Sequence, residues 1–144
     1  MHTFCYHAGG CVFHLTDQNT ETLAAALPRL KNLELGQPCH LNSCNATITS
    51  LVSVSAHCLD LTTLETHFNT LKIVSDMRRL LGDSTGRGEA KCRLRSLSVG
   101  LLGIDVCEED TAAVAMGFKV IFPYLTNFTG HDDRWRKLES KLGD

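Results

Sequence analysis

The sequence has no long apolar run and no excess of one charge, and each absence excludes a class of protein. Its 144 residues include 14 Lys and Arg against 16 Asp and Glu, so the formal net charge is −2. Binding to nucleic-acid phosphates needs a basic stripe, which this balance does not supply. No stretch approaches the roughly 18–20 consecutive apolar residues of a membrane helix. We therefore expect neither a nucleic-acid partner nor a membrane partner.

A paired cysteine framework is also missing. The chain has seven cysteines, an odd number, and their spacing is irregular. Domains stapled by disulfides normally use an even number of cysteines and fold in oxidising compartments. The residues before Cys11 contain no apolar core of the kind that a secretory signal requires. The sequence thus predicts an intracellular protein, in the cytoplasm or the nucleus.

Motifs for catalysis and metal binding are incomplete. Three zinc-type ligands lie within residues 39–44, but no second ligand pair follows at the spacing of a zinc finger. The glycine-rich stretch 82–88 has Arg87 where a phosphate-binding loop needs a lysine. Residues 131–133, His-Asp-Asp, precede a predicted helix, and two aspartates there are favoured as helix caps. No serine lies in a G-x-S-x-G elbow. We predict no catalytic residue, no metal site and no cofactor.

What the sequence does contain is a leucine pattern that recurs at a near-constant interval. The first leucines of the four matching segments are Leu30, Leu61, Leu94 and Leu125. They lie 31, 33 and 31 residues apart. A fixed period of roughly 20–50 residues is typical of repeat proteins, in which each unit buries its apolar face against its neighbours. The pattern predicts one domain made of stacked units, roughly 1–29, 30–60, 61–93, 94–124 and 125–144.

Each leucine segment follows a stretch with helical spacing, so every unit is expected to hold one helix and one short strand. In the first helix, for example, Thr16 or Asp17 can cap the start, and Pro28 cannot continue the helix. We expect helices at 15–27, 51–58, 67–81, 108–122 and 132–142, and strands at 30–35, 59–66, 92–100 and 125–128. Acidic residues at 108–110 favour the start of the fourth of these helices. Such alternation implies right-handed crossovers and a parallel sheet. The predicted fold class is α/β, a leucine-rich-repeat-like solenoid: a short horseshoe with helices on its convex side and a C-terminal capping helix.

Several segments together resemble the C-terminal leucine-rich-repeat region of fungal F-box-type proteins, over roughly residues 11–142. The segments that carry the resemblance are Leu-Pro-Arg-Leu-Lys-Asn-Leu-Glu-Leu-Gly at 27–36, His-Cys-Leu-Asp-Leu-Thr-Thr-Leu at 57–64, Leu-Arg-Ser-Leu-Ser-Val-Gly at 94–100, and Ile-Phe-Pro-Tyr-Leu at 121–125 with Trp135. The resemblance implies a substrate receptor of a cullin-type ubiquitin ligase. No F-box helix set is visible, so it implies a partial member, with a ligase adaptor as partner only if an F-box lies upstream.

A partner surface is expected on the strand residues that alternate with the buried leucines and face outward from the concave sheet. The candidate partner-binding residues are Lys31, Glu34, Thr63, Glu65, His67, Arg95, Ser98 and Asn127. This face lacks aromatic side chains, and Arg95 is its best single anchor because binding anchors are usually Trp, Tyr or Arg.

The resulting hypothesis is a non-enzymatic protein-interaction module. Two other interpretations stay open. One is a truncated or degenerate repeat remnant that has no partner. The other is a small α/β enzyme in which the leucine period is accidental, and which would need a concave pocket with convergent polar groups.

Overall fold

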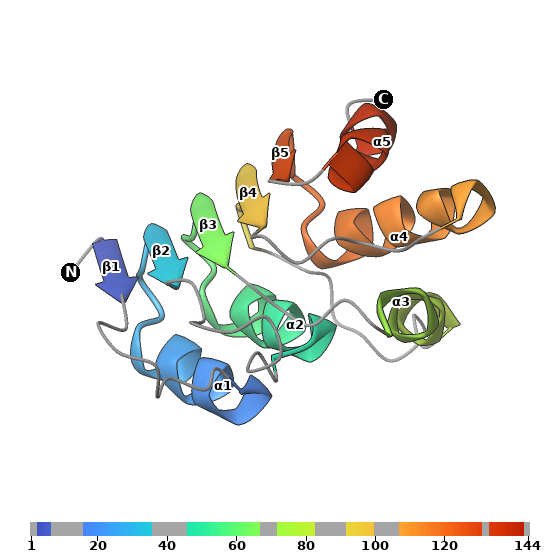
Figure 1. Ribbon diagram of the computed structural model, residues 1–144. Helices are drawn as coiled ribbons and strands as arrows, with labels where there is room; N and C mark the ends of the chain where they lie inside the picture. Colours follow the sequence, from blue (N-terminus) through green and yellow to red (C-terminus); the bar gives the residue numbers. More distant parts are fainter. Residues whose placement is uncertain are drawn as a thin grey trace.

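The structure, a computed structural model, describes residues 3–6, 16–35, 46–66, 72–82, 92–99, 107–130 and 133–142. Within these residues five short strands alternate with five helices (Figure 1). In chain order they are β1 (Thr3–Tyr6), α1 (Asp17–Ala26), β2 (Asn32–Leu35), α2 (Ile48–His57), β3 (Thr63–Thr66), α3 (Ile73–Gly82), β4 (Ser96–Val99), α4 (Glu108–Ile121), β5 (Asn127–Gly130) and α5 (Asp133–Leu142).

All five strands belong to one parallel sheet, and their order in the sheet is their order in the chain, β1-β2-β3-β4-β5. Figure 1 shows α1 to α4 along one side of this sheet and α5 beside β5, with the two termini at opposite ends. The expected α/β class with a parallel sheet is confirmed. Within the described ranges, no helix has the length and apolar character needed to cross a membrane.

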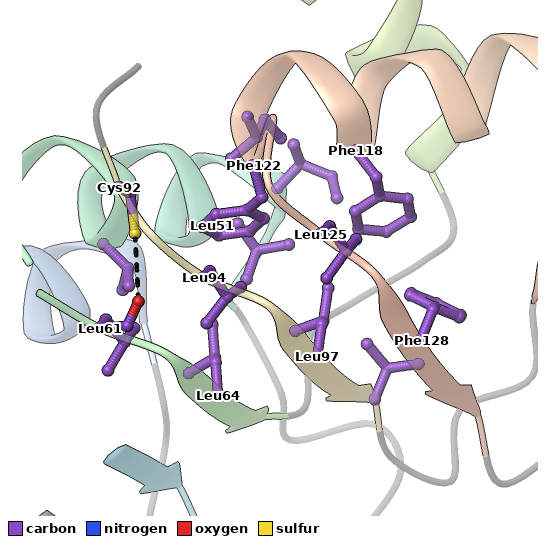
Figure 2. Close-up of a cluster of buried hydrophobic side chains, with 14 of the residues drawn as sticks. Leu51, Leu61, Leu64, Cys92, Leu94, Leu97, Phe118, Phe122, Leu125 and Phe128 are labelled. Atoms are coloured by element: carbon purple, nitrogen blue, oxygen red, sulfur yellow. Dashed lines mark hydrogen bonds between the residues drawn. The ribbon is translucent and has the colours of Figure 1, made fainter. Parts of the chain in front are cut away.

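The register of the strands aligns equivalent apolar residues across the sheet. Leu33 pairs with Leu64, Leu64 with Leu97, and Leu97 with Phe128. All four side chains are buried beneath the helices, where the Phe128 ring contacts the ring of Phe118 on α4 at a centroid distance of 5.3 Å (Figure 2). Because each row joins neighbouring units, the core is continuous along the sheet instead of being divided among the units.

The strands begin later than the sequence predicted. Each starts two residues after its leucine, at Asn32, Thr63, Ser96 and Asn127. The leucines themselves are almost completely buried, at 0–1% exposure, but they lie in the turns that precede the strands. In three of these turns the leucine N–H donates to the carbonyl three residues earlier, for example from Leu30 to Leu27 at 3.2 Å. The predicted strand starts at 30, 59, 92 and 125 were wrong. They were inferred from the apolar pattern, which reports burial and does not show where the hydrogen bonds between strands begin.

One helix also begins earlier than predicted, and one strand was not predicted. Helix α2 starts three residues before the expected 51, whereas α4 starts at Glu108, the first of the acidic residues expected at its start. Polar residues that were taken to precede α2 belong to its first turn, and the Thr47 hydroxyl before it accepts from the Thr49 N–H at 3.2 Å. Strand β1 was missed, although its residues Thr, Phe and Tyr favour strands and Phe4 pairs with Leu33.

Polar contacts tie neighbouring helices together at their ends. The Asp17 carboxylate at the start of α1 accepts hydrogen bonds from the Thr47 N–H (2.7 Å), the Thr47 hydroxyl (2.8 Å) and the Ser50 hydroxyl (2.6 Å) at the start of α2. An ion pair joins Arg78 on α3 to Asp110 on α4. A carboxylate near helix N-termini is favoured by the partial positive charge there. These contacts therefore fix how far each unit is offset from the next.

Candidate functional site

The side of the sheet away from the helices carries the polar side chains that alternate with the leucine rows, and we call it the outward strand face. Its first row, defined by the register, is Asn32, Thr63, Ser96 and Asn127. Its second row is Glu34, Glu65, Ser98 and Thr129. These residues are half-buried or exposed, while their neighbours along β2 to β5 are buried, apart from Gly130 at the end of β5. Adjacent members of a row are about 4.8 Å apart.

Like charges lie side by side in the second row. Glu34 and Glu65 are register partners on β2 and β3, and both are half-buried. Two directly opposed carboxylates on neighbouring strands disfavour each other.

Two basic residues lie at the other end of the same face, each just before a strand. Lys31 and Arg95 are both exposed. The Lys31 carbonyl accepts from the Thr62 N–H (2.8 Å) and the Thr62 hydroxyl (3.1 Å), and the Arg95 carbonyl accepts from Thr126 in the same way, at 3.0 and 3.2 Å. The repeated bonding holds both backbones in equivalent positions. Lys31 and Arg95 thus precede β2 and β4, the two strands that lie on either side of β3 in the sheet.

Seven of the eight residues predicted to bind a partner lie on this face or at its edge, and His67 lies outside the described residues. The register brings Glu34, Glu65 and Ser98 into one row. Thr63 and Asn127 share the other row, separated by Ser96. The row residue Asn32 is held by its side chain, which donates to the Thr3 hydroxyl at 3.3 Å. The outward strand face thus has two glutamates in its second row, and two basic residues, Lys31 and Arg95, just before the strands.

The part of the chain that the structure describes contains no group of three or more His, Cys, Asp or Glu side chains able to hold a metal ion. In that part, every buried side-chain nitrogen and oxygen atom also has a hydrogen-bond partner. The predicted alternatives at 39–44, 83–88 and 131–132 lie outside the described residues. No chemical step can therefore be built on these groups.

Two buried cysteines are held by the backbone. The Cys58 thiol lies 3.7 Å from the Ala24 carbonyl and 3.6 Å from the Leu27 carbonyl. The Cys92 thiol donates to the Cys58 carbonyl at 3.2 Å and lies 3.9 Å from that of Leu61 (Figure 2). Each thiol thus contacts the preceding unit.

The ionisation of these two thiols is disfavoured. Burial raises the pKa of Cys58 and raises that of Cys92 to about 11. For Cys92 the Leu94 backbone acts in the opposite direction, and the neighbouring Cys58 adds a small further increase to the pKa. Nucleophilic cysteines need a lowered pKa and access to solvent. We therefore interpret both thiols as packing groups.

Comparisons of the chain with protein-family models, with curated proteins and with solved structures found no match. The candidate site is therefore defined by the geometry and residue chemistry of the outward strand face.

Proposed function

We propose that this chain is a non-enzymatic protein-interaction module, a leucine-rich-repeat-like solenoid that binds a protein through its outward strand face. The observation that carries the proposal is that α1 to α4 lie along one side of the sheet, away from this face. Fully parallel sheets normally have helices on both faces. In repeat proteins a one-sided stack of strand–helix units leaves the sheet available as an extended concave surface for a partner.

The regularity of the units supports the solenoid part of the proposal. Strands β2 to β5 each start two residues after their leucine, and the carbonyls of Lys31, Thr62 and Arg95 each accept two N–H groups from the next unit. The period of 31–33 residues exceeds the roughly 20–29 residues usual in leucine-rich repeats. The extra length lies in the helices and loops, since every strand has four residues.

The size of the outward strand face limits the kind of partner. Five strands about 4.8 Å apart, each rising about 3.3 Å per residue over four residues, give a surface of roughly 250 Å². A stable protein interface buries about 800 Å² on each partner. We therefore propose that the partner contacts the loops beside the strands as well. It would place a basic residue over Glu65 and acidic residues over Lys31 and Arg95.

The resemblance to F-box-type repeats suggests a more specific role for this surface. In that role the outward strand face would hold the target of a cullin-type ubiquitin ligase. Binding of the ligase adaptor would require an F-box upstream of the repeats.

Pull-down with mass spectrometry tests the proposed surface. Wild type is compared with Glu65→Arg and Arg95→Glu, and with Glu21→Arg, a charge reversal at an exposed position of α1. Reversing a charge within an interface costs a few kcal/mol, so recovery of a specific partner should fall at least about tenfold with either strand-face variant. The α1 variant should recover it as wild type does. An unchanged partner set with both strand-face variants would exclude this surface.

A further inference from the structure

Helix α4 is apolar on two opposite sides. Its inner side packs into the core through Val114, Phe118 and Ile121, all of which are buried. On its outer side Met116 and Val120, one turn apart, expose 60% and 38% of their surface. Tyr124, in the turn that follows the helix, exposes 58%. We call these three exposed residues the α4 ridge.

Among the residues whose side chains the structure describes, the other helices do not share this feature. Their exposed positions are Gln18, Asn19, Glu21, Thr22, Ala25 and Ala26 on α1, Thr49 and Ala56 on α2, Ser75, Arg78, Arg79 and Gly82 on α3, and Arg136, Ser140 and Lys141 on α5. Within the described ranges, the remaining large exposed apolar side chain is Leu59, in the turn after α2. A single exposed leucine is ordinary. Clustered exposed apolar side chains bordered by polar residues mark a binding surface.

The helices on either side of the α4 ridge are basic. Helices α3 and α5 both pack against α4 (Figure 1). Residues 72–82 have three basic residues against one acidic residue, and α5 has four against two. These two segments hold seven of the 14 Lys and Arg of a chain whose net charge is −2. Arg78 pairs with Asp110 and Arg79 with Asp76, and the formal charge of each flank stays positive.

We propose that the α4 ridge binds an amphipathic helical segment of another protein, one whose apolar stripe is bordered by Asp and Glu. Side chains one turn apart pack between the apolar side chains of a second helix. Acidic residues beside that stripe would face the positive flanks of α3 and α5. This surface lies on the helix side of the molecule, so its use does not depend on the outward strand face.

Charge also discriminates between this partner and two other occupants. A second copy of the chain would bring its own positive α3 and α5 against those of the first copy, which like charges disfavour. An anionic membrane would meet the exposed Glu109, which lies two turns before Met116 on the same side of α4. A peptide can leave an uncharged residue opposite Glu109, whereas a lipid surface cannot.

The test is selection of a phage-displayed library of random 16-residue peptides on the full chain. Recovered peptides are synthesised, and their binding is measured by fluorescence anisotropy to wild type, Met116→Asp and Tyr124→Ala. The control is Ala25→Asp, which introduces the same charge at an exposed position of α1. Circular dichroism confirms that each variant is folded. Vesicles containing phosphatidylserine form a separate arm.

The proposal expects peptides rich in Asp and Glu with apolar residues three and four positions apart. Their affinity should fall at least about tenfold with Met116→Asp, because an interface centre tolerates an unpaired charge poorly. It should fall with added salt and stay within about twofold of wild type with Ala25→Asp.

Basic or uncharged peptides, peptides indifferent to Met116→Asp, or no enrichment at all would overturn the proposal. Vesicle binding that depends on Met116, in place of peptide binding, would assign the ridge to a membrane. If Met116→Asp abolishes peptide binding but still recovers the partner of the outward strand face in the pull-down, the two surfaces act independently.

Discussion

Gly117 lies on the side of α4 that meets α3, and the absence of a side chain lets the two helices approach. A Cβ at this position would lie 2.2 Å from Sδ of Met77, 3.0 Å from its Cγ and 3.2 Å from its Cβ. Met77 is completely buried, so its side chain has no solvent-filled space into which it can move. The contact depends on glycine because of packing and not because of backbone conformation.

Gly117→Ala is therefore expected to destabilise the protein. Overpacking of a core typically costs about 1–3 kcal/mol, whereas alanine gains at most about 1 kcal/mol over glycine inside a helix. The control is Gly82→Ala at the end of α3, where a Cβ meets nothing within 4 Å and the change should be neutral or stabilising. Urea unfolding compares the two variants. Equal stability of both would show that α3 and α4 are not packed as closely as the structure has them.

The residue scale also shows what sequence patterns can predict. The burial of Leu30, Leu61, Leu94 and Leu125 followed from their period, because the core face of each unit repeats. The role of Asp17 did not follow. It was predicted as a possible cap of α1, but Thr16 caps that helix and Asp17 bonds to α2, 30 and 33 residues away in the sequence. A single sequence carries no pattern for a polar contact between units.

At the scale of elements, the thiols of Cys58 and Cys92 join the segments that precede β3 and β4 to the backbone of the preceding helix-to-strand segment. The raised pKa of Cys92, about 11 against an ordinary 9.0, means that the folded chain keeps its proton at pH values where the unfolded chain loses it. The stabilisation is complete below the unfolded pKa and is lost as the pH rises towards the folded pKa. The free energy of unfolding should therefore decrease between about pH 9 and 11.

Measuring urea unfolding between pH 8 and pH 11 tests this expectation. A full difference of one proton changes the free energy of unfolding by up to about 1.4 kcal/mol for each pH unit. Other groups titrate in the same range, so the comparison is with Cys92→Ala, which should show a shallower decrease although it is less stable overall. Identical slopes for the two proteins would show that the Cys92 thiol ionises as easily in the folded chain as in the unfolded chain.

Element type was easier to predict than element bounds. The alternation in Leu33-Glu34-Leu35 and the spacing of Leu23 and Leu27 before Pro28 give the correct order of helix and strand. The starts were displaced by two to four residues for the strands and by three for α2. Apolar patterns report burial, and a buried residue can lie in a turn as well as in a strand. The bounds depend on backbone hydrogen bonds to the neighbouring unit.

For the whole molecule, the buried core runs along the parallel sheet, and α5 packs against β5 and α4 at one end. Leu138 and Leu142 of α5 are buried, and the Gly130 N–H of β5 donates to the Glu139 carboxylate at 3.1 Å. In the solenoid proposed above, damage at one end would weaken the adjacent units before it reached the distant ones. The end at β5 should therefore respond separately from the end at β1.

Leu138→Ala is expected to lower the free energy of unfolding by about 2–5 kcal/mol, as for other buried leucines. Amide hydrogen exchange should accelerate in α4 and β5 more than in α1 and β2. The control is Lys141→Ala, at an exposed position of the same helix, which should change neither. A uniform increase in exchange along the chain would mean that the molecule opens only as a whole.

The arrangement of the candidate surfaces was predictable only in part. The outward strand face follows from alternation along each strand. The α4 ridge does not, because Met116 and Val120 could equally have belonged to the core of a helix apolar on every side. Which side faces solvent depends on where α3 and α5 lie, and that is a property of the assembled stack.

The sequential order of the strands also affects how this molecule can change in size. In the proposed solenoid, helices about 10 Å wide lie beside strands about 4.8 Å apart, so the helix side would be longer than the strand side and the sheet would curve. Insertion or deletion of one strand–helix unit would lengthen or shorten the sheet by one strand, and the packing between the other units would stay the same. The length of the outward strand face can thus change while the sequences of the existing units stay the same.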